Sequence, residues 1–250
     1  MSYELLAYYY DDLMKDVEYE NWLSFFENNC KSFDLDKNIE ILDLGCGTGI
    51  FISLLLEMNY KNVYGLDLSD EMLSVAYERL EEQGQYATLF QGDMTEFELD
   101  KQFDVIIIFC DGLNYIKSKD DVIKTFRQVK KHLRPGGLFM FDVHSIYKII
   151  TAFNNQTYSI VEEDFALIWA TLRGENENSV EHELTFFIQN EEGSYDKYTE
   201  FQQQCTYPVE DYKKWLEDEN FSKIEFLGDF STENEVSTSE RILFCTQYNG

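Results

Sequence analysis

Five short apolar segments recur along the first part of the chain, at 39–44, 62–67, 87–91, 103–109 and 138–142. The segment 103–109 is apolar at nearly every position, which is typical of a central parallel strand buried on both faces. Between the segments, apolar residues are spaced three and four apart, which predicts helices. Strands and helices that alternate in this way predict a parallel sheet covered by helices on both faces.

Capping residues mark the ends of two of these helices. Ser69 is the predicted N-cap of one helix, and Ser118 with Asp121 predicts a capping box for the helix over 120–133. The sequence Arg-Pro-Gly-Gly at 134–137 is expected to end the second helix. The predicted inner faces are Met72, Val75, Ala76 and Leu80 in the first helix and Val122, Phe126, Val129 and Leu133 in the second.

The residues before and after these alternating strands and helices follow other patterns. Residues 4–30 have apolar positions at helical spacing and predict an N-terminal helical cap. Apolar and polar residues alternate through 157–206, which predicts four antiparallel strands. After Pro208, a helix and two strands near 223–228 and 241–247 are expected to return to the main sheet.

These patterns together predict an α/β fold with two structural parts. The main part is a Rossmann-like, mostly parallel seven-stranded sheet with helices on both faces and an N-terminal helical cap, formed by residues 1–145 and 208–250. Residues 146–207 are expected to form an inserted antiparallel β-sheet, which we call the lid.

The charge of the chain excludes several partners. Twenty Lys and Arg face 48 Asp and Glu, so the formal net charge is −28. Nucleic acids and anionic membranes bind basic patches, so we expect neither as a partner. Two interpretations of the acidic residues remain open: a solubilising surface, or acids that face a cationic substrate.

Location and metal content are inferred from what the chain lacks. It has no stretch of 18 apolar residues, and its N-terminus is acidic rather than basic, so we predict a cytoplasmic protein without a membrane span. The five cysteines are scattered and form no CxxC pair, so we expect neither disulfides nor a metal site.

A glycine-rich loop follows the first predicted strand, as in nucleotide-type sites. A dinucleotide fingerprint requires G-x-G-x-x-G. Gly45 and Gly47 fit this pattern, but the sixth position is Ile50 and the third glycine comes early, at Gly49. The spacing therefore disfavours the alternative of a nicotinamide-dependent oxidoreductase.

The sequence Leu-Asp-Leu-Gly-Cys-Gly-Thr-Gly at 42–49 resembles the first motif of class I methyltransferases that use S-adenosylmethionine (SAM). The resemblance covers roughly residues 37–145, together with the last helix and two strands. It implies that the loop residues Gly45, Cys46, Gly47 and Gly49 approach the methionine part of SAM, since glycine lets the backbone come close. It also implies that Asp43 holds the ammonium group of SAM.

Further segments match this family in the expected order. Asp67, at the end of the second strand, is expected to accept hydrogen bonds from the ribose hydroxyls, with Leu68 and Met72 beside it. The segment Gln-Gly-Asp-Met at 91–94 resembles the family's adenine-reading segment. The resemblance implies the remaining cofactor contacts from Asp93, Met94, Cys110 and Asp111.

The two added parts have a looser resemblance to small-molecule methyltransferases. In those enzymes a Tyr of a Tyr-Asp pair closes over the cofactor, and this Tyr corresponds to Tyr10 here. The lid is similar in layout to that of sugar-amine N,N-dimethyltransferases, where it forms a wall of the acceptor pocket. This implies that residues 146–207 lie on the acceptor side.

The acceptor and its activation remain open at this point. A small molecule is expected, with an amine nitrogen first, since a neutral amine needs no base before it attacks. A hydroxyl or carbon acceptor benefits from a base, and Tyr115 and His144 are the catalytic candidates, both just past predicted strand ends. The alternatives are a non-catalytic SAM-binding regulatory module and a methyltransferase that acts on a protein.

Overall fold

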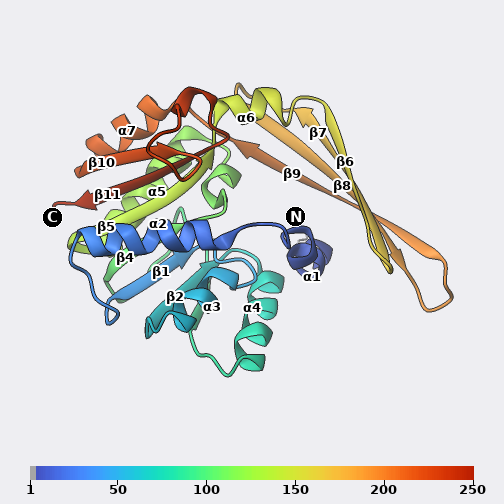
Figure 1. Cartoon of the computed structure of the whole chain (residues 1–250), viewed down its shortest axis with the longest axis horizontal. Helices are drawn as coiled ribbons and strands as arrows, with labels where there is room; N and C mark the ends of the chain where they lie inside the picture. Colours follow the sequence, from blue (N-terminus) through green and yellow to red (C-terminus); the bar gives the residue numbers. More distant parts are fainter. Residues whose placement is uncertain (1–3) are drawn as a thin grey trace.

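Seven strands form the central sheet of the computed structural model, which describes residues 4–250 (Figure 1). Their order is β10-β11-β5-β4-β1-β2-β3, and only β11 runs antiparallel to its neighbours. The predicted mostly parallel seven-stranded sheet is therefore confirmed. The strands are β1 (Glu40–Leu44), β2 (Asn62–Asp67), β3 (Thr88–Gln91), β4 (Phe103–Ile108), β5 (Leu133–His144), β10 (Phe221–Gly228) and β11 (Arg241–Tyr248).

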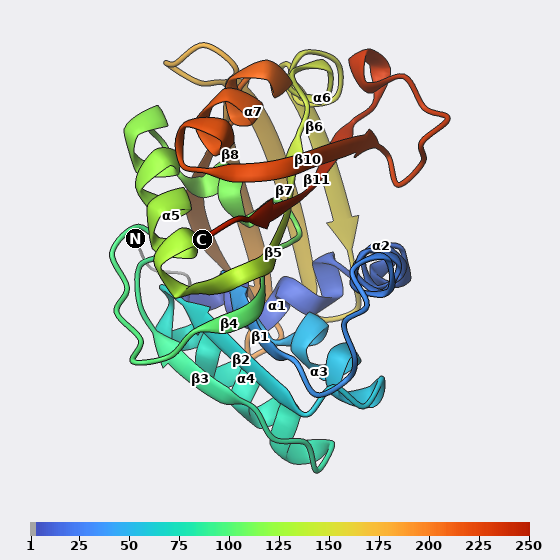
Figure 2. The same cartoon turned by 90° about the vertical axis from the view of Figure 1, so that its left-hand side faces the viewer.

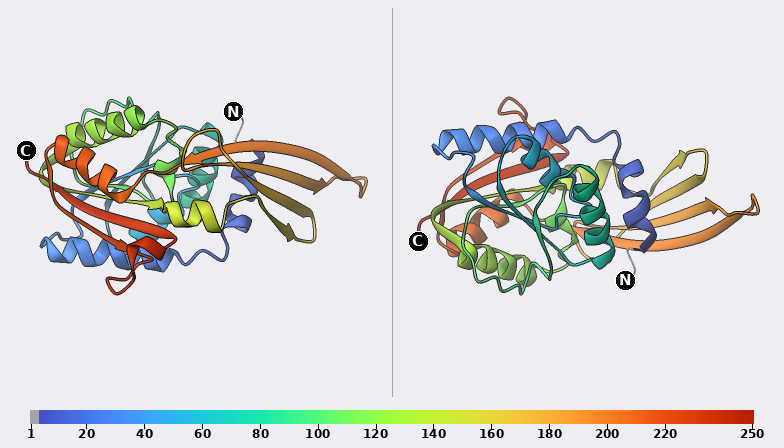
Figure 3. Two further views of the ribbon diagram at one scale, coloured as in Figure 1. Left: turned by 90° about the horizontal axis from the view of Figure 1, so that it is seen from above. Right: turned by 90° about the horizontal axis from the view of Figure 1, so that it is seen from below.

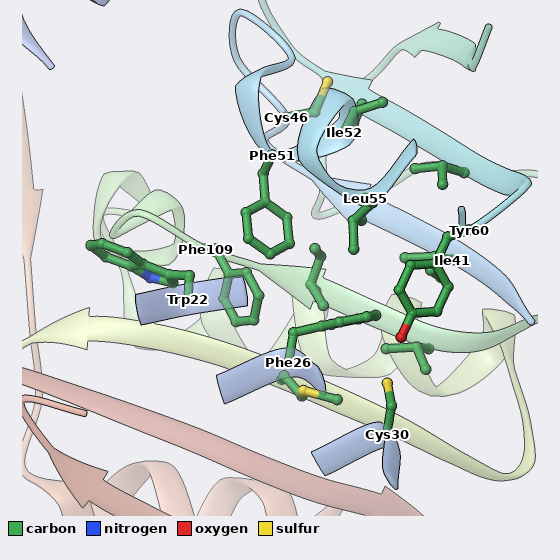
Figure 4. Close-up of a cluster of buried hydrophobic side chains, with 14 of the residues drawn as sticks. Trp22, Phe26, Cys30, Ile41, Cys46, Phe51, Ile52, Leu55, Tyr60 and Phe109 are labelled. Atoms are coloured by element: carbon green, nitrogen blue, oxygen red, sulfur yellow. The ribbon is translucent and has the colours of Figure 1, made fainter. Parts of the chain in front are cut away.

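Helices cover both faces of this sheet, as the pattern predicted (Figure 2). On one face lie α2 (Tyr19–Ser32), α3 (Ile50–Glu57) and part of α4 (Asp70–Glu82), and on the other lie α5 (Lys119–His132) and α7 (Val209–Asp218). Figure 4 shows the first apolar layer, where side chains of α2 and α3 meet those of the sheet.

The two predicted helix caps are present. The hydroxyl of Ser69 accepts a hydrogen bond from the Met72 N–H at 3.1 Å, and that of Ser118 accepts one from the Asp121 N–H at 3.1 Å. Each cap satisfies a backbone donor that the helix leaves free. The Ser69 cap matters for the site, because it fixes the chain between the end of β2 and α4.

The residues after α5 differ from the prediction. The segment at 134–137 ends the helix, but it belongs to β5, which begins at Leu133 instead of residue 138. Phe103 pairs with Leu133 and Val105 with Leu138, so the extra residues form an irregularity in the strand pairing. Such a bulge tolerates a proline, which has no N–H to donate, and a glycine at positive φ.

The lid is a separate four-stranded antiparallel sheet with the order β6-β7-β8-β9. It consists of β6 (Gln156–Val161), β7 (Phe165–Arg173), β8 (Ser179–Gln189) and β9 (Tyr195–Cys205), and Figure 3 shows it extending away from the main sheet. The four predicted strands are thus confirmed. A short helix before them, α6 (Ile146–Thr151), was not predicted.

The N-terminal cap consists of two helices, whereas the sequence predicted one helical stretch over 4–30. A turn at residues 14–18 separates α1 (Glu4–Leu13) from α2. The two helices have different partners: α2 packs on the main sheet, and α1 lies between α4 and the lid. The Tyr9 ring packs against that of Phe165 on β7, with the ring centroids 4.7 Å apart and the planes tilted by 48°. The chain bends because one straight helix cannot reach both surfaces.

No helix within residues 4–250 is long and apolar enough to cross a membrane. The five cysteines are free thiols.

Candidate functional site

A cavity of about 540 Å³ opens at the carboxyl ends of β1, β2, β3 and β4. The chain connections change direction beside β1 in the order β5-β4-β1-β2-β3. Open α/β sheets bind their ligands at this kind of switch point. Most of the predicted site residues line this one cavity, namely Tyr10, Asp43, Gly45, Cys46, Gly47, Asp67, Leu68, Met72, Asp93, Met94, Cys110 and Tyr115.

Two aromatic rings line the cavity and join it to the core. Phe51 of α3 and Phe109, just after β4, meet edge to face with ring centroids 5.0 Å apart (Figure 4). Both side chains are buried. Their packing fixes the start of α3 against the end of β4, and so sets the width of the cavity between these two elements.

The glycine loop and the end of β2 are tied together by one carboxylate. Asp67 accepts hydrogen bonds from the Gly47 N–H at 2.8 Å and from the Ser69 N–H at 2.9 Å. Gly47 has a φ of +53°, and a Cβ built there would meet no atom within 4 Å. The loop therefore presents bare backbone to the cavity, with the oriented Asp67 carboxylate beside it.

Asp43 is a buried carboxylate without a cation. Its side chain is 3% exposed, and no ion pair among the described residues includes it. Burial, with a further contribution from the negative charge of Asp67, raises the pKa of Asp43 to about 8. A positively charged ligand group at this position would favour the ionised form and lower that pKa.

The loop after β3 is fixed by its own side chains. Asp93 accepts hydrogen bonds from the N–H and the hydroxyl of Thr95, at 2.8 and 2.7 Å. The Met94 side chain lies against Gly45, where an added Cβ would come within 3.3 Å of it. The two predicted residues of this loop therefore line the cavity in a defined arrangement.

Five uncharged side chains form another part of the lining, which we call the neutral wall: Tyr10, Tyr19, Cys110, Tyr115 and Gln202. Tyr10 interacts electrostatically with Cys110, Tyr115 and Tyr19, so these groups lie close together. Burial raises the pKa of Tyr10, Tyr19 and Cys110 well above their usual values. Their hydroxyl and thiol groups therefore stay protonated at neutral pH.

Helix α1 is fastened over the glycine loop by a polar contact. The Thr48 hydroxyl donates to Asp11 at 2.8 Å, and Arg79 of α4 pairs with the same carboxylate. Arg79 also donates to the Thr48 carbonyl at 2.8 Å. This contact holds Tyr10, the neighbour of Asp11, in the cavity wall.

Three predicted site residues lie outside the cavity lining. Gly49 is the N-cap of α3 at a φ of +75°, and an added Cβ would come within 3.0 Å of Ala76, so its role is close packing of the loop on α4. Asp111 turns away from the cavity and pairs with Arg241 at 3.0 Å.

His144, the third of these, lies behind Asp111, with its Nε2 3.4 Å from the Asp111 carboxylate. Burial lowers the pKa of His144 to about 4, so it is neutral at pH 7. The structure therefore places His144, a predicted catalytic residue, outside the cavity lining. The sequence placed it correctly at a strand end, but β5 brings that end beneath the Asp111 turn.

Other lining residues were not predicted. They include Tyr19 on α2, Lys117 after the short helix Gly112–Tyr115, and Gln202 and Gln203 on β9. Gln202 and Gln203 follow Asp121, the preceding lining residue in the sequence, by 81 and 82 residues. No pattern in the sequence indicates which end of β9 reaches the main sheet, so nothing in the alternation could have identified them.

Comparisons with known proteins agree with this arrangement. A family model described as a methyltransferase domain matches residues 41–137. A predicted methyltransferase of Geobacillus sp. (strain WCH70) is 39% identical over 99% of this chain and 100% of its own length.

Two further proteins resemble this chain. A crystal structure of an S-adenosylmethionine-dependent methyltransferase from Clostridium acetobutylicum ATCC 824 superposes with a TM-score of 0.86 at 30% identity, covering 99% of each chain. The dTDP-4-amino-2,3,4,6-tetradeoxy-D-glucose N,N-dimethyltransferase of Saccharopolyspora spinosa is 34% identical over 41% of this chain and 39% of that enzyme.

Proposed function

Because this chain belongs to the class I SAM-dependent methyltransferase family, we propose that it transfers the methyl group of SAM to the nitrogen of a small amine. The chain is thus a SAM-dependent enzyme, and the amine acceptor is the proposal. The observation that carries it is the neutral wall, which offers an acceptor hydrogen-bonding groups but no general base.

The cavity residues fit SAM in three respects. The buried Asp43 carboxylate pairs with no cation among the described residues and would take the ammonium group, and Asp67 would accept from the ribose hydroxyls. The bare backbone at Gly47 leaves room for close approach. In the loop after β3, Asp93 and Met94 would face the adenine, with Met72 and Leu68 as apolar neighbours.

The chemistry then follows from which residues surround the reacting atoms. When bound, SAM supplies a methyl group on a positively charged sulfur, which a nitrogen lone pair can attack directly. Tyr10, Tyr19 and Cys110 stay protonated, so they can orient an acceptor but cannot remove a proton from it. An amine that enters in its neutral form needs no such removal, whereas a hydroxyl benefits from it.

Size and relatives also support a small amine. A cavity of about 540 Å³ must accommodate both SAM and acceptor, which leaves room for a small molecule. The Saccharopolyspora spinosa relative is named for transfer to an amino sugar, although its match covers only 41% of this chain.

The function is tested with carbon-13-methyl SAM and a panel of small amines, alcohols and carboxylates, with the methylated atom identified by NMR. Label on nitrogen supports the proposal. Label that appears on oxygen or carbon of these compounds, or in protein added to the assay, would replace the amine with another acceptor class.

If transfer needs no base, substitution of Tyr115 or His144, the two predicted catalytic residues, should have only a small effect on kcat. Tyr115→Phe and His144→Ala should each lower kcat less than about 10²-fold, the lower end of what removal of a general base costs. Steady-state kinetics at saturating SAM measures this. A loss near 10⁴-fold with SAM affinity intact would instead identify that residue as a base and argue against an amine.

The raised pKa of Asp43 predicts how the affinity for SAM depends on pH. Its carboxyl is protonated below pH 8 in the free protein but must ionise to hold an ammonium group, so SAM binding should release a proton. The affinity should therefore rise up to about tenfold per pH unit between pH 6 and 7.5. It should level off near pH 8, where an α-amino group, with a pKa of about 7.7–8.0, begins to lose its charge.

Calorimetry in two buffers of different ionisation enthalpy measures the released proton directly. Asp43→Asn, which cannot ionise, serves as the control and should bind SAM more weakly, without this rise. Equal affinity of the wild-type protein at pH 6 and 7.5, or proton uptake on binding, would contradict the assignment of Asp43.

A further inference from the structure

Gln202 lies near the carboxyl end of β9, where this strand returns from the tip of the lid to the main sheet (Figure 1). Its side chain is 5% exposed and lines the cavity. In the strand pairing it lies opposite His182 of β8. The lid therefore contributes this amide to the neutral wall.

The neighbouring amide on the same face of β9 has a partner for its nitrogen and for its oxygen. Gln204 donates to Asp111 at 2.7 Å, and its oxygen lies 3.1 Å from Nε2 of His182. The other nitrogen of that ring accepts from the Trp169 indole N–H at 3.0 Å. This chain of hydrogen bonds anchors the end of β9 to the turn after β4.

The Gln202 amide, by contrast, makes no hydrogen bond with the side chains and backbone groups that the structure describes. A nearly buried amide without a partner is unfavourable unless something else satisfies it. Because it faces the cavity, a ligand bound there can satisfy the amide in place of water. An amide offers one donor group and one acceptor oxygen, so its complement is a neutral polar group such as a hydroxyl or a carbonyl.

The charges around Gln202 limit the acceptor further. Lys117 is the one basic residue of the described cavity lining, against Asp43, Asp67, Asp93, Glu96 and Asp121. The lid strands and their turns, residues 156–205, carry eleven Asp and Glu but only Arg173 and Lys197 as bases. A phosphate or diphosphate group needs charge-assisted partners, mainly arginines and lysines, and here it would meet repulsion.

We infer that the acceptor is an amine without phosphate and that the Gln202 amide binds a hydroxyl or carbonyl group on it. The inference rests on the proposed transfer to a small amine and adds the feature by which the site selects among amines. Gln202 is thus a residue that determines specificity. The Saccharopolyspora spinosa relative is named for a substrate that carries dTDP, so it differs from this chain in the acceptor it takes.

The test compares Gln202→Leu with the wild-type protein, using two matched pairs of probes. The pair trans-4-aminocyclohexanol and cyclohexylamine differs by one hydroxyl, and the pair glucosamine and glucosamine 6-phosphate differs by one phosphate. Affinities are measured by calorimetry with S-adenosylhomocysteine bound, so that they do not depend on transfer. Gln189→Leu, the same change at an exposed end of β8, is the control.

The wild-type protein should bind aminocyclohexanol about 5- to 150-fold more tightly than cyclohexylamine, and glucosamine more tightly than its phosphate. Gln202→Leu should abolish the first preference and leave SAM affinity within about twofold. Its melting temperature should stay equal or rise, because no protein partner of the amide is lost. Gln189→Leu should behave as wild type.

Four results would overturn the inference: a retained hydroxyl preference in Gln202→Leu, a loss of SAM affinity, a lowered melting temperature, or tighter binding of the phosphate. Absence of binding by all four amines would also overturn it. If the expected binding pattern appears but no nitrogen is methylated, the proposed function fails while the role of Gln202 stands.

Discussion

Arg241→Met should lower the free energy of unfolding by about 3–5 kcal/mol, because it leaves the buried Asp142 and the largely buried Asp111 without their cation. Arg241 pairs with Asp142 and with Asp111, and the Asp142 side chain is 0% exposed. Its guanidinium also lies 4.8 Å from the centre of the Trp22 ring. The Trp22 indole N–H donates in turn to Asp142 at 2.7 Å.

This cluster joins elements that are distant in the sequence. Asp142 lies on β5, Asp111 follows β4, Trp22 lies on α2 and Arg241 begins β11. Gln204 connects the lid to this cluster through its hydrogen bond to Asp111. The Asp111 N–H also donates to Asp142 at 3.0 Å, which holds the left-handed turn at Cys110 and Asp111. Loss of Arg241 therefore weakens the turn that shapes the neutral wall.

Denaturant unfolding followed by circular dichroism measures the effect. Arg127→Met is the matched control, since Arg127 is well exposed and its pair with Glu219 should contribute less than about 1 kcal/mol. Burial already raises the pKa of Asp142, and without Arg241 that pKa should rise further. A protonated Asp142 needs no cation, so the deficit of Arg241→Met should shrink as the pH falls. Equal, small effects of the two substitutions would mean that the cluster contributes little.

The sequence predicted the α/β core well because its signals there are local. The apolar run at 103–109 is strand β4, and the Ser69 cap lies where the pattern put it. In both cases adjacent residues determine the structure, through burial on both faces or through one cap hydrogen bond. The same holds for Asp43 near the end of β1 and the loop residues 45–47, which are close in sequence and line the cavity together.

The errors occurred where tertiary contacts decide. A turn splits the N-terminal helix because α1 and α2 pack on different surfaces, and no residue between 14 and 18 is a proline or a glycine that would have marked it. The bulge at 134–137 extends β5 because the neighbouring β4 tolerates an irregular register.

Tertiary contacts also limit the prediction of residues on the acceptor side of the cavity. The sequence predicts His144, one of the three histidines, just past a strand end, yet that strand end lies beneath Asp111 rather than in the cavity. Gln202 has no distinguishing neighbour in its run of three glutamines, and only the position of β9 against the main sheet brings it into the cavity. The residue type indicates which chemistry a side chain can perform, whereas the packing of the lid against the main sheet determines which side chains reach the cavity.

If SAM binds in this cavity with its ribose held by Asp67, Asp67→Ala removes that contact. Losing the acceptor of buried polar groups costs about 1–3 kcal/mol, so SAM should bind about 5- to 150-fold more weakly. Asp67 also orients the Gly47 N–H, so its loss can act through the loop as well. The 2′,3′-dideoxy analogue of SAM separates these effects, because it lacks the hydroxyls but still contacts the loop.

The decisive measurement is calorimetric titration of SAM and of this analogue into the wild-type protein, Asp67→Ala and the control Asp70→Ala, which changes an exposed carboxylate in the first turn of α4. Asp67→Ala should weaken SAM binding about 5- to 150-fold but weaken binding of the analogue much less, whereas Asp70→Ala should change neither affinity. Wild-type SAM affinity in folded Asp67→Ala, or equal weakening of SAM and the analogue, would contradict this placement of the SAM ribose.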